Sequence, residues 1–174
     1  MILIGYIADR VPKRLLFVSL LTGQIAATAS YYFLPAGSLG AIFTLEILGS
    51  FVGAPLPVLL WAMYADTADY GEWHSGRRTT ALVFSASLMS QKIGWALAAF
   101  VAFKLLAYVG FTANIAPSAQ VKESLVHLMS IIPAVLGIAS IVTFLFYPLN
   151  DKKVAEINAA LSSRRKDASG AATV

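Results

Sequence analysis

The chain has 174 residues, of which 58% are hydrophobic and only 13% are charged, and its mean hydropathy is +0.73. Soluble domains carry about 25% charged residues, so this composition excludes a water-soluble globular fold and predicts an integral membrane protein in a lipid bilayer. The formal net charge of +4 is not a nucleic-acid signature here, and the lack of cysteine excludes disulfides and thiolate metal sites.

Four apolar segments are long enough to cross a bilayer, which takes about 20 residues of helix. They predict an all-α, polytopic membrane helical bundle with spans at residues 15–34, 39–65, 81–109 and 124–149. The first seven residues are apolar but too short to span, and charges follow them, which is the reverse of a signal peptide. We therefore expect the chain to start with the end of a fifth helix whose beginning is missing.

Lysine and arginine are distributed unevenly between the two ends of these spans. Residues 8–14 hold three, residues 66–80 hold two and the tail after Leu149 holds five, whereas connections 35–38 and 110–123 hold one between them. Cytoplasmic loops carry such an excess of positive charge. The first two loops and the C-terminus are therefore predicted to be cytoplasmic, in a multi-pass protein of the plasma (inner) membrane.

The first two spans contain polar and helix-breaking residues at membrane depth. Gln24 either bonds to a neighbouring helix or lines a polar cavity. Gly49 and Gly53 form a small-residue pair that permits close helix approach. Pro55 and Pro57 follow, and two prolines this close together predict a kink or an interruption. Interrupted helices at this depth line transporter sites, although prolines also make packing kinks.

The third span carries Lys92 near its centre, where a lysine cannot easily reach the interface. It should face the interior of the bundle and have a partner, whereas Lys104, nearer the end, can reach the boundary. Glu46, in the second span, is either protonated and hydrogen-bonded or faces a wet cavity. It lies about two turns away from the level of Lys92. The missing partner of Lys92 again predicts that part of the protein is absent.

The densest charge cluster lies between the second and third spans. It consists of three acids at a spacing of three and a pair of arginines: Asp66, Asp69, Glu72, Arg77 and Arg78. Because ionised groups are costly in hydrocarbon, we expect a solvent-facing loop. An alternative is a Mg²⁺ site formed by the acids with His74, as in a metal-dependent membrane enzyme. No second acidic cluster supports this alternative.

The C-terminal residues predict a cytoplasmic tail, 150–174, attached to a membrane domain, 1–149. Val154, Ile157 and Leu161 recur at helical spacing within residues 151–166, and three basic residues follow. A short amphipathic helix of this kind suits the anionic surface of the inner leaflet.

Several motifs together resemble one transporter family. They are the run from Trp61 to Trp73 with Gly76-Arg77-Arg78, the Lys92-Ile93-Gly94 triplet and the Tyr147-Pro148-Leu149 exit. They are similar to the glycoside–pentoside–hexuronide:cation symporters, the melibiose permease-like branch of the major facilitator superfamily. A facilitator loop motif is also similar, at Gly5, Asp9, Arg10, Lys13 and Arg14. The resemblance covers essentially the whole chain and corresponds to the end of helix 8 and helices 9–12 of twelve.

The resemblance implies roles for matching residues. The charges at Asp66, Asp69, Glu72 and Arg78 would pair between halves of the transporter to close an inner gate. Lys92 would face the central cavity, near acids of an N-terminal half that is missing here. Those acids would bind a small sugar-like solute and a coupling cation, Na⁺ or H⁺, with no other cofactor.

Two cavity positions depart from the family pattern. Pro57 stands where melibiose permease-like proteins have an aromatic residue, and Leu88 stands at a polar cavity position one turn before the lysine. Both departures disfavour a galactoside and leave other glycosides, pentoses and hexuronides open.

Three functional hypotheses follow. The first is the C-terminal fragment of a sugar:cation symporter that works by alternating access. The second is a truncated remnant that does not transport, because four full helices and part of a fifth cannot form both walls of a central cavity. The metal-dependent enzyme is the least favoured, and we expect no enzymatic activity.

Overall fold

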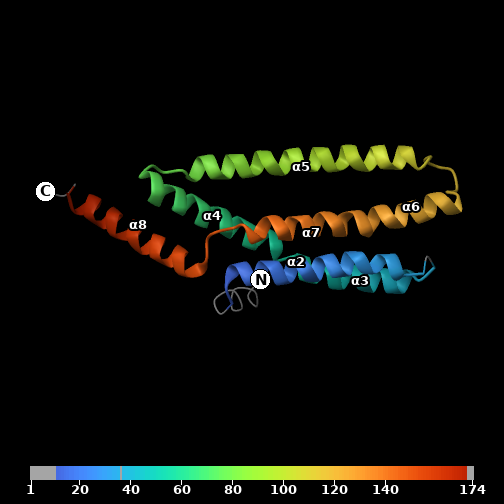
Figure 1. Ribbon diagram of the computed structural model, residues 1–174, viewed down its shortest axis with the longest axis horizontal. Helices are drawn as coiled ribbons and strands as arrows, with labels where there is room; N and C mark the ends of the chain where they lie inside the picture. Colours follow the sequence, from blue (N-terminus) through green and yellow to red (C-terminus); the bar gives the residue numbers. More distant parts are fainter. Residues whose placement is uncertain (1–10, 36, 172–174) are drawn as a thin grey trace. The chain divides into compact units, whose positions relative to one another are not determined.

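The computed structural model describes residues 11–35 and 37–171, and within these ranges every regular element is helical (Figure 1). In chain order the elements are α2 (Lys13–Ser30), the 3-10 turn η1 (Tyr31–Phe33), α3 (Leu39–Gly53), α4 (Leu56–Ser75), α5 (Thr80–Tyr108), α6 (Ala119–Met129), α7 (Ile131–Leu145) and α8 (Asp151–Ala171). The predicted all-α architecture is confirmed. The expected end of a fifth helix at residues 1–7 lies outside the described residues.

Four helical stretches are long and apolar enough to cross a membrane, which agrees with the four predicted spans. They are Lys13–Phe33, Leu39–Ser75, Thr80–Tyr108 and Ala119–Leu145. Few of their side chains are covered by protein, so apolar side chains such as Phe51, Trp95 and Phe103 are exposed. In a membrane such surfaces contact lipid or other protein segments.

The second span is interrupted where its prolines predict. Helix α3 ends at Gly53, residues 54 and 55 form a turn, and α4 begins at Leu56. Pro55 and Pro57 lack the N–H groups that would bond to the carbonyls of Phe51 and Gly53, four residues back.

The three acids of the charge cluster are helical, so the prediction of a loop was wrong for them, whereas Arg77 and Arg78 lie in a non-helical connection as predicted. Helix α4 continues through all three acids to Ser75, and the turn begins at Gly76, which has a φ of +69°. The backbone hydrogen bonds of a helix form within the helix itself, whether its side chains are apolar or charged. Helix α4 can therefore continue past the apolar part of the span into its charged residues. The three acids therefore share one helical backbone.

The last span is also divided, at Ser130. Pro133 removes the amide that would bond to the carbonyl of Met129, which explains the break between α6 and α7. Ser130 is fully buried, and its hydroxyl donates to the Val126 carbonyl at 2.6 Å.

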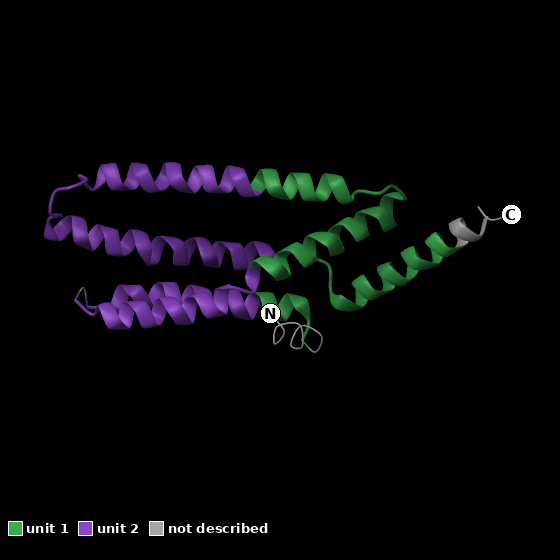
Figure 2. Cartoon of the chain, turned by 180° about the vertical axis from the view of Figure 1, so that it is seen from behind, with its two compact units in different colours: residues 1–17, 57–90, 147–174 green, residues 18–56, 91–146 purple. Residues whose placement is uncertain are grey.

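The chain divides into two compact units (Figure 2). Unit 1 comprises residues 1–17, 57–90 and 147–174, and unit 2 comprises residues 18–56 and 91–146. The buried apolar cluster of unit 1 is formed by α8 and the residue that precedes it by two positions, Leu149. In unit 2, α2 and α3 pack through small residues, with a Cβ at Gly49 placed 3.5 Å from Ala27. Each unit therefore has packing of its own.

Candidate functional site

The candidate site is the set of charged contacts in unit 1 that joins the start of α2, the C-terminal half of α4 and α8. Lys13 Nζ lies 2.9 Å from Oδ2 of Asp66 and 3.2 Å from Oδ1. Asp66 is only 9% exposed, and a buried carboxylate requires such a partner. The backbone N–H of Lys13 also donates to Asp151 Oδ2 at 3.1 Å, so one residue contacts both α4 and α8.

A second ion pair connects α4 to α8 two turns further along. Arg165 Nη2 lies 3.2 Å from both carboxylate oxygens of Glu72, and Arg164 donates to the Trp73 carbonyl at 3.4 Å. The Arg165 side chain is 62% exposed. Exposed ion pairs contribute about 0–1 kcal/mol, so this pair orients α8 more than it stabilises it.

Apolar packing supplies most of the contact between α8 and the rest of unit 1. Val154, Ile157 and Leu161 form the predicted amphipathic face, and with Leu149 they are buried against Tyr70 and Tyr147. The expectation that this face lies on the inner leaflet was wrong. It is covered by protein because two aromatic rings offer a closer apolar surface. The Lys153 ammonium lies 5.4 Å from the centre of the Tyr70 ring, as in a cation–π contact.

Tyr147 lies at the junction of these contacts. Its hydroxyl donates to the Met63 carbonyl at 3.4 Å. Burial raises the pKa of Tyr147. A side-chain hydrogen bond with Thr67 acts against this shift, and the carboxylates of Asp66 and Asp151 add to it. The hydroxyl therefore remains a neutral donor at physiological pH.

The remaining members of the charge cluster are differently placed. Asp69 is half-buried and makes no hydrogen bond or ion pair with the residues that the structure describes. The side chains of Arg77 and Arg78 are exposed. The turn that carries them is held by Thr79, whose hydroxyl donates to the Ala68 carbonyl at 3.0 Å. Three charges of the cluster are therefore open to other partners.

The alternative of a metal site is not supported by the side-chain arrangement. Over residues 11–35 and 37–171, no three Asp, Glu or His side chains are grouped for a metal ion. Two of the acids are held by Lys13 and Arg165, and His74 stacks on Tyr70.

Lys92 and Leu88 both lie on exposed parts of α5, in which no residue is buried. Lys92 makes no hydrogen bond or ion pair within the described part of the chain. Its position in a cavity stays a prediction.

The other predicted cavity residues lie near the break between α3 and α4 or toward the start of α3. Pro57 is exposed in the first turn of α4. Glu46 is exposed and accepts a hydrogen bond from the Tyr31 hydroxyl. Gln24 packs against Gly49 and Gly53, but its buried Oε1 accepts no hydrogen bond within the described residues. Whether it bonds to a neighbouring helix or lines a cavity stays a prediction.

The facilitator loop motif is only partly described. Gly5, Asp9 and Arg10 lie outside the described residues, whereas Lys13 and Arg14 begin α2. Sequence reasoning missed the Lys13–Asp66 and Arg165–Glu72 pairs. The available signal was that the positive-inside rule placed all four residues on the same side of the membrane, with opposite charges.

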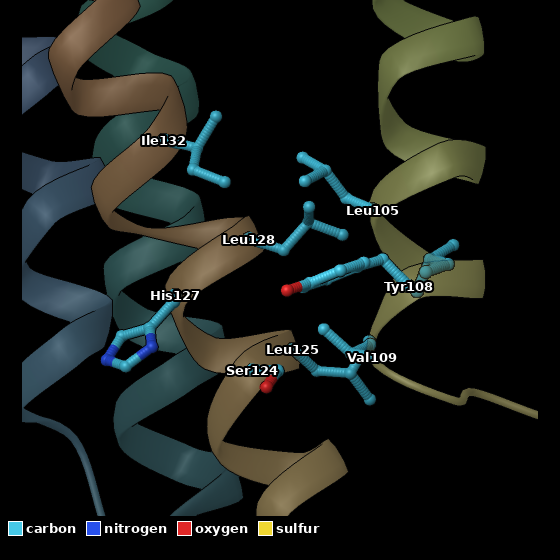
Figure 3. A pocket seen from close by; sticks show the side chains of 9 residues that line it. Leu105, Tyr108, Val109, Ser124, Leu125, His127, Leu128 and Ile132 are labelled. Carbon is cyan, nitrogen blue, oxygen red and sulfur yellow. The ribbon is translucent and has the colours of Figure 1, made fainter.

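Unit 2 contains an apolar groove between the end of α5 and the start of the last span (Figure 3). It holds about 240 Å³ and is lined mainly by aliphatic side chains, with Tyr108, Ser124 and His127 as its polar members. Such a lining suits a hydrocarbon chain better than a hydroxylated solute, so the groove is not a candidate sugar site.

Comparison with known proteins places these features in a family. The profile of MFS/sugar transport proteins matches residues 1–151. The chain is 31% identical over 157 residues to the "Putative 2,3-dihydroxypropane-1-sulfonate exporter" of Salmonella typhimurium strain LT2, an alignment covering 90% of the chain and 34% of the relative.

Two proteins of Escherichia coli K12 are also similar. The "Putative glycoside/cation symporter YagG" is 36% identical over 132 residues, covering 75% of the chain and 29% of the relative. The "Glucuronide carrier protein homolog" is 27% identical over 149 residues, covering 84% of the chain and 33% of the relative. The chain thus spans about a third of the length of these relatives. No solved structure matches it significantly.

Proposed function

The chain belongs to the MFS/sugar transport protein family, and we propose that it forms part of a cation-coupled secondary transporter in the inner membrane. The observation that carries this proposal is the family match over residues 1–151, which includes all four membrane-spanning stretches. Transport would follow alternating access, in which two helical bundles move about a central site.

The proposed solute is a small hydroxylated molecule, neutral or anionic. The names of the three relatives refer to a dihydroxypropane sulfonate, a glycoside and a glucuronide, all of which carry hydroxyl groups and two of which are acidic. A lysine at mid-membrane depth complements an acidic solute. We therefore assign Lys92 to the solute or cation site of the complete transporter.

The charged contacts of unit 1 have the chemistry of a gate on the cytoplasmic side. Asp66 and Glu72 are already held by Lys13 and Arg165, which leaves Asp69, Arg77 and Arg78 to pair with the rest of the transporter. Ion pairs that form in one state and break in the other bias the equilibrium between the two states. The C-terminus lies on the same side as this gate, in the cytoplasm.

The test is uptake of a labelled glycoside and a labelled glucuronide by vesicles that contain the complete transporter, under an imposed Na⁺ or proton gradient. We expect gradient-driven uptake, which Lys92→Ala reduces at least tenfold, a loss of about 1.4 kcal/mol of transition-state stabilisation. Lys104→Ala is the matched control and should retain uptake.

Two outcomes would contradict the proposal. Absence of gradient-driven uptake of either solute would exclude coupled transport of this class. Equal effects of the two lysine variants would remove Lys92 from the site. Cells that express only the 174 residues should show no uptake if the chain is a non-transporting remnant.

A further inference from the structure

The break between α3 and α4 leaves backbone carbonyls without their helical donors. Pro57 has no N–H to donate to the Gly53 carbonyl, and Pro55 has none for the carbonyl of Phe51. Within a membrane, freed carbonyls of this kind are satisfied by side chains of neighbouring helices or by water.

Gln24 of α2 is the polar side chain that reaches this break. A Cβ added to Gly53 would lie 2.6 Å from Gln24 Oε1, so the amide touches the last residue of α3. Gly49, one turn earlier, leaves room for the same amide, whose Nε2 lies 3.9 Å from the position of a Cβ there. The two glycines therefore form a notch that the amide occupies.

The amide lies in this notch without a hydrogen bond. Gln24 Oε1 is the one buried side-chain oxygen or nitrogen of the described residues that has no hydrogen-bond partner. A buried acceptor without a donor is destabilising. The oxygen lies beside Gly53, the last residue of α3. It cannot bond to the Gly53 carbonyl, because both atoms are acceptors.

We propose that Gln24 caps α3 from the neighbouring helix. A half-turn of the amide about its last side-chain bond exchanges Oε1 and Nε2, which have nearly the same shape. The Nε2 group then donates to the Gly53 carbonyl, which gains a donor in place of the N–H that Pro57 lacks. Gln24 is in this sense a positioning residue for the interrupted span.

The choice between the two freed carbonyls follows from the contacts of Gln24. Its amide packs against Gly53, whereas the Phe51 residue is 83% exposed. The cap therefore belongs to the Gly53 carbonyl, and that of Phe51 is left to another donor.

The direct test is solid-state NMR of the full chain in lipid bilayers, with ¹⁵N in glutamine side chains and ¹³C in glycine carbonyls. We expect a Gln–Gly contact that corresponds to an N–O distance of about 2.9 Å. The chain has glutamines only at positions 24, 91 and 120, so Gln24→Leu identifies the signal by abolishing it. Absence of the contact in the unaltered chain, or its persistence in Gln24→Leu, would overturn the proposal.

A second measurement tests positioning and does not depend on transport. The chain has no cysteine, so spin labels can be placed selectively at Thr44→Cys in α3 and Trp61→Cys in α4, both exposed residues. The inter-label distance distribution should broaden in Gln24→Leu. It should stay unchanged in Thr22→Val, whose hydroxyl bonds within its own helix to the Val18 carbonyl at 2.7 Å.

An unchanged distribution in Gln24→Leu would show that the cap does not position the break. Both measurements use the isolated chain, so a negative result leaves the transport proposal standing, and a failure of the uptake test leaves the cap standing.

Discussion

Helices α4 and α5 follow one another in the chain, but they differ in how many of their side chains are buried or held in ion pairs. In α4, Leu59, Met63, Asp66 and Ala68 are buried, and two of its three acids form ion pairs. Helix α5 is longer, at 29 residues, yet none of its residues is buried. Its central charge, Lys92, has no partner among the described residues.

The side chains of α4 are partnered by other residues of the same chain, whereas those of α5 require lipid or further protein as partners. The contacts of α4 use residues from both ends of the sequence, Lys13 and Arg165, and need no other molecule. The surface of α5 is apolar apart from a few residues, and lipid or further protein must cover it in a membrane. Substitutions in α4 and α8 should therefore change the stability of the chain, whereas those in α5 should change its activity.

The largest effect is expected from Ile157→Ala, at the centre of the α8 contact. Ile157 is 2% exposed, and truncating a buried isoleucine to alanine costs about 3 kcal/mol. Hydrogen exchange of the α8 amides in detergent micelles should accelerate accordingly. The exposed neighbour Asn158→Ala serves as the control, and equal exchange in both variants would show that α8 is not held by this cluster.

A smaller effect is expected from Asp66→Asn. The substitution leaves Lys13, whose side chain is 35% exposed, without a carboxylate, at a cost of about 2 kcal/mol. Thermal unfolding in detergent measures it. Asp69→Asn is the matched control, because Asp69 has no partner in the described structure and should change stability by less than about 0.5 kcal/mol. Equal destabilisation by Asp66→Asn and Asp69→Asn would show that the Lys13–Asp66 ion pair does not stabilise the chain.

The smallest effect on stability is expected from Lys92→Leu. Substitution of an exposed residue without contacts should change the unfolding free energy by less than about 0.5 kcal/mol. The same thermal unfolding measurement detects it. A clear destabilisation by Lys92→Leu would mean that Lys92 has a partner within this chain. Helix α5 would then resemble α4 in having a charge that is paired within the chain.

The spans and the break at Pro55 and Pro57 could be predicted from the sequence, because both depend on local properties. Apolar length defines a membrane span, and a missing N–H disrupts a helix wherever it occurs. The family could also be recognised, since its motifs lie within single segments such as residues 61–73.

The pairing of charges could not be predicted, because it depends on which helix ends lie together. Asp66 and Lys13 are 53 positions apart, and Glu72 and Arg165 are 93 apart. The burial of α8 was missed for the same reason. Val154, Ile157 and Leu161 define an apolar face, but periodicity does not reveal whether lipid or protein covers it.

The uninterrupted path of α4 has a mechanical consequence. Glu72 lies 16 residues after the start of the helix at Leu56, or about 24 Å along a rigid rod. Tilting that rod by about 10° at the proline break would move Glu72 sideways by about 4 Å, which exceeds the reach of a hydrogen bond. A small bend at Ala54–Pro55 would therefore make or break contacts between the far end of α4 and partners that lie outside unit 1, while α8, which packs on Tyr70, would move with the helix.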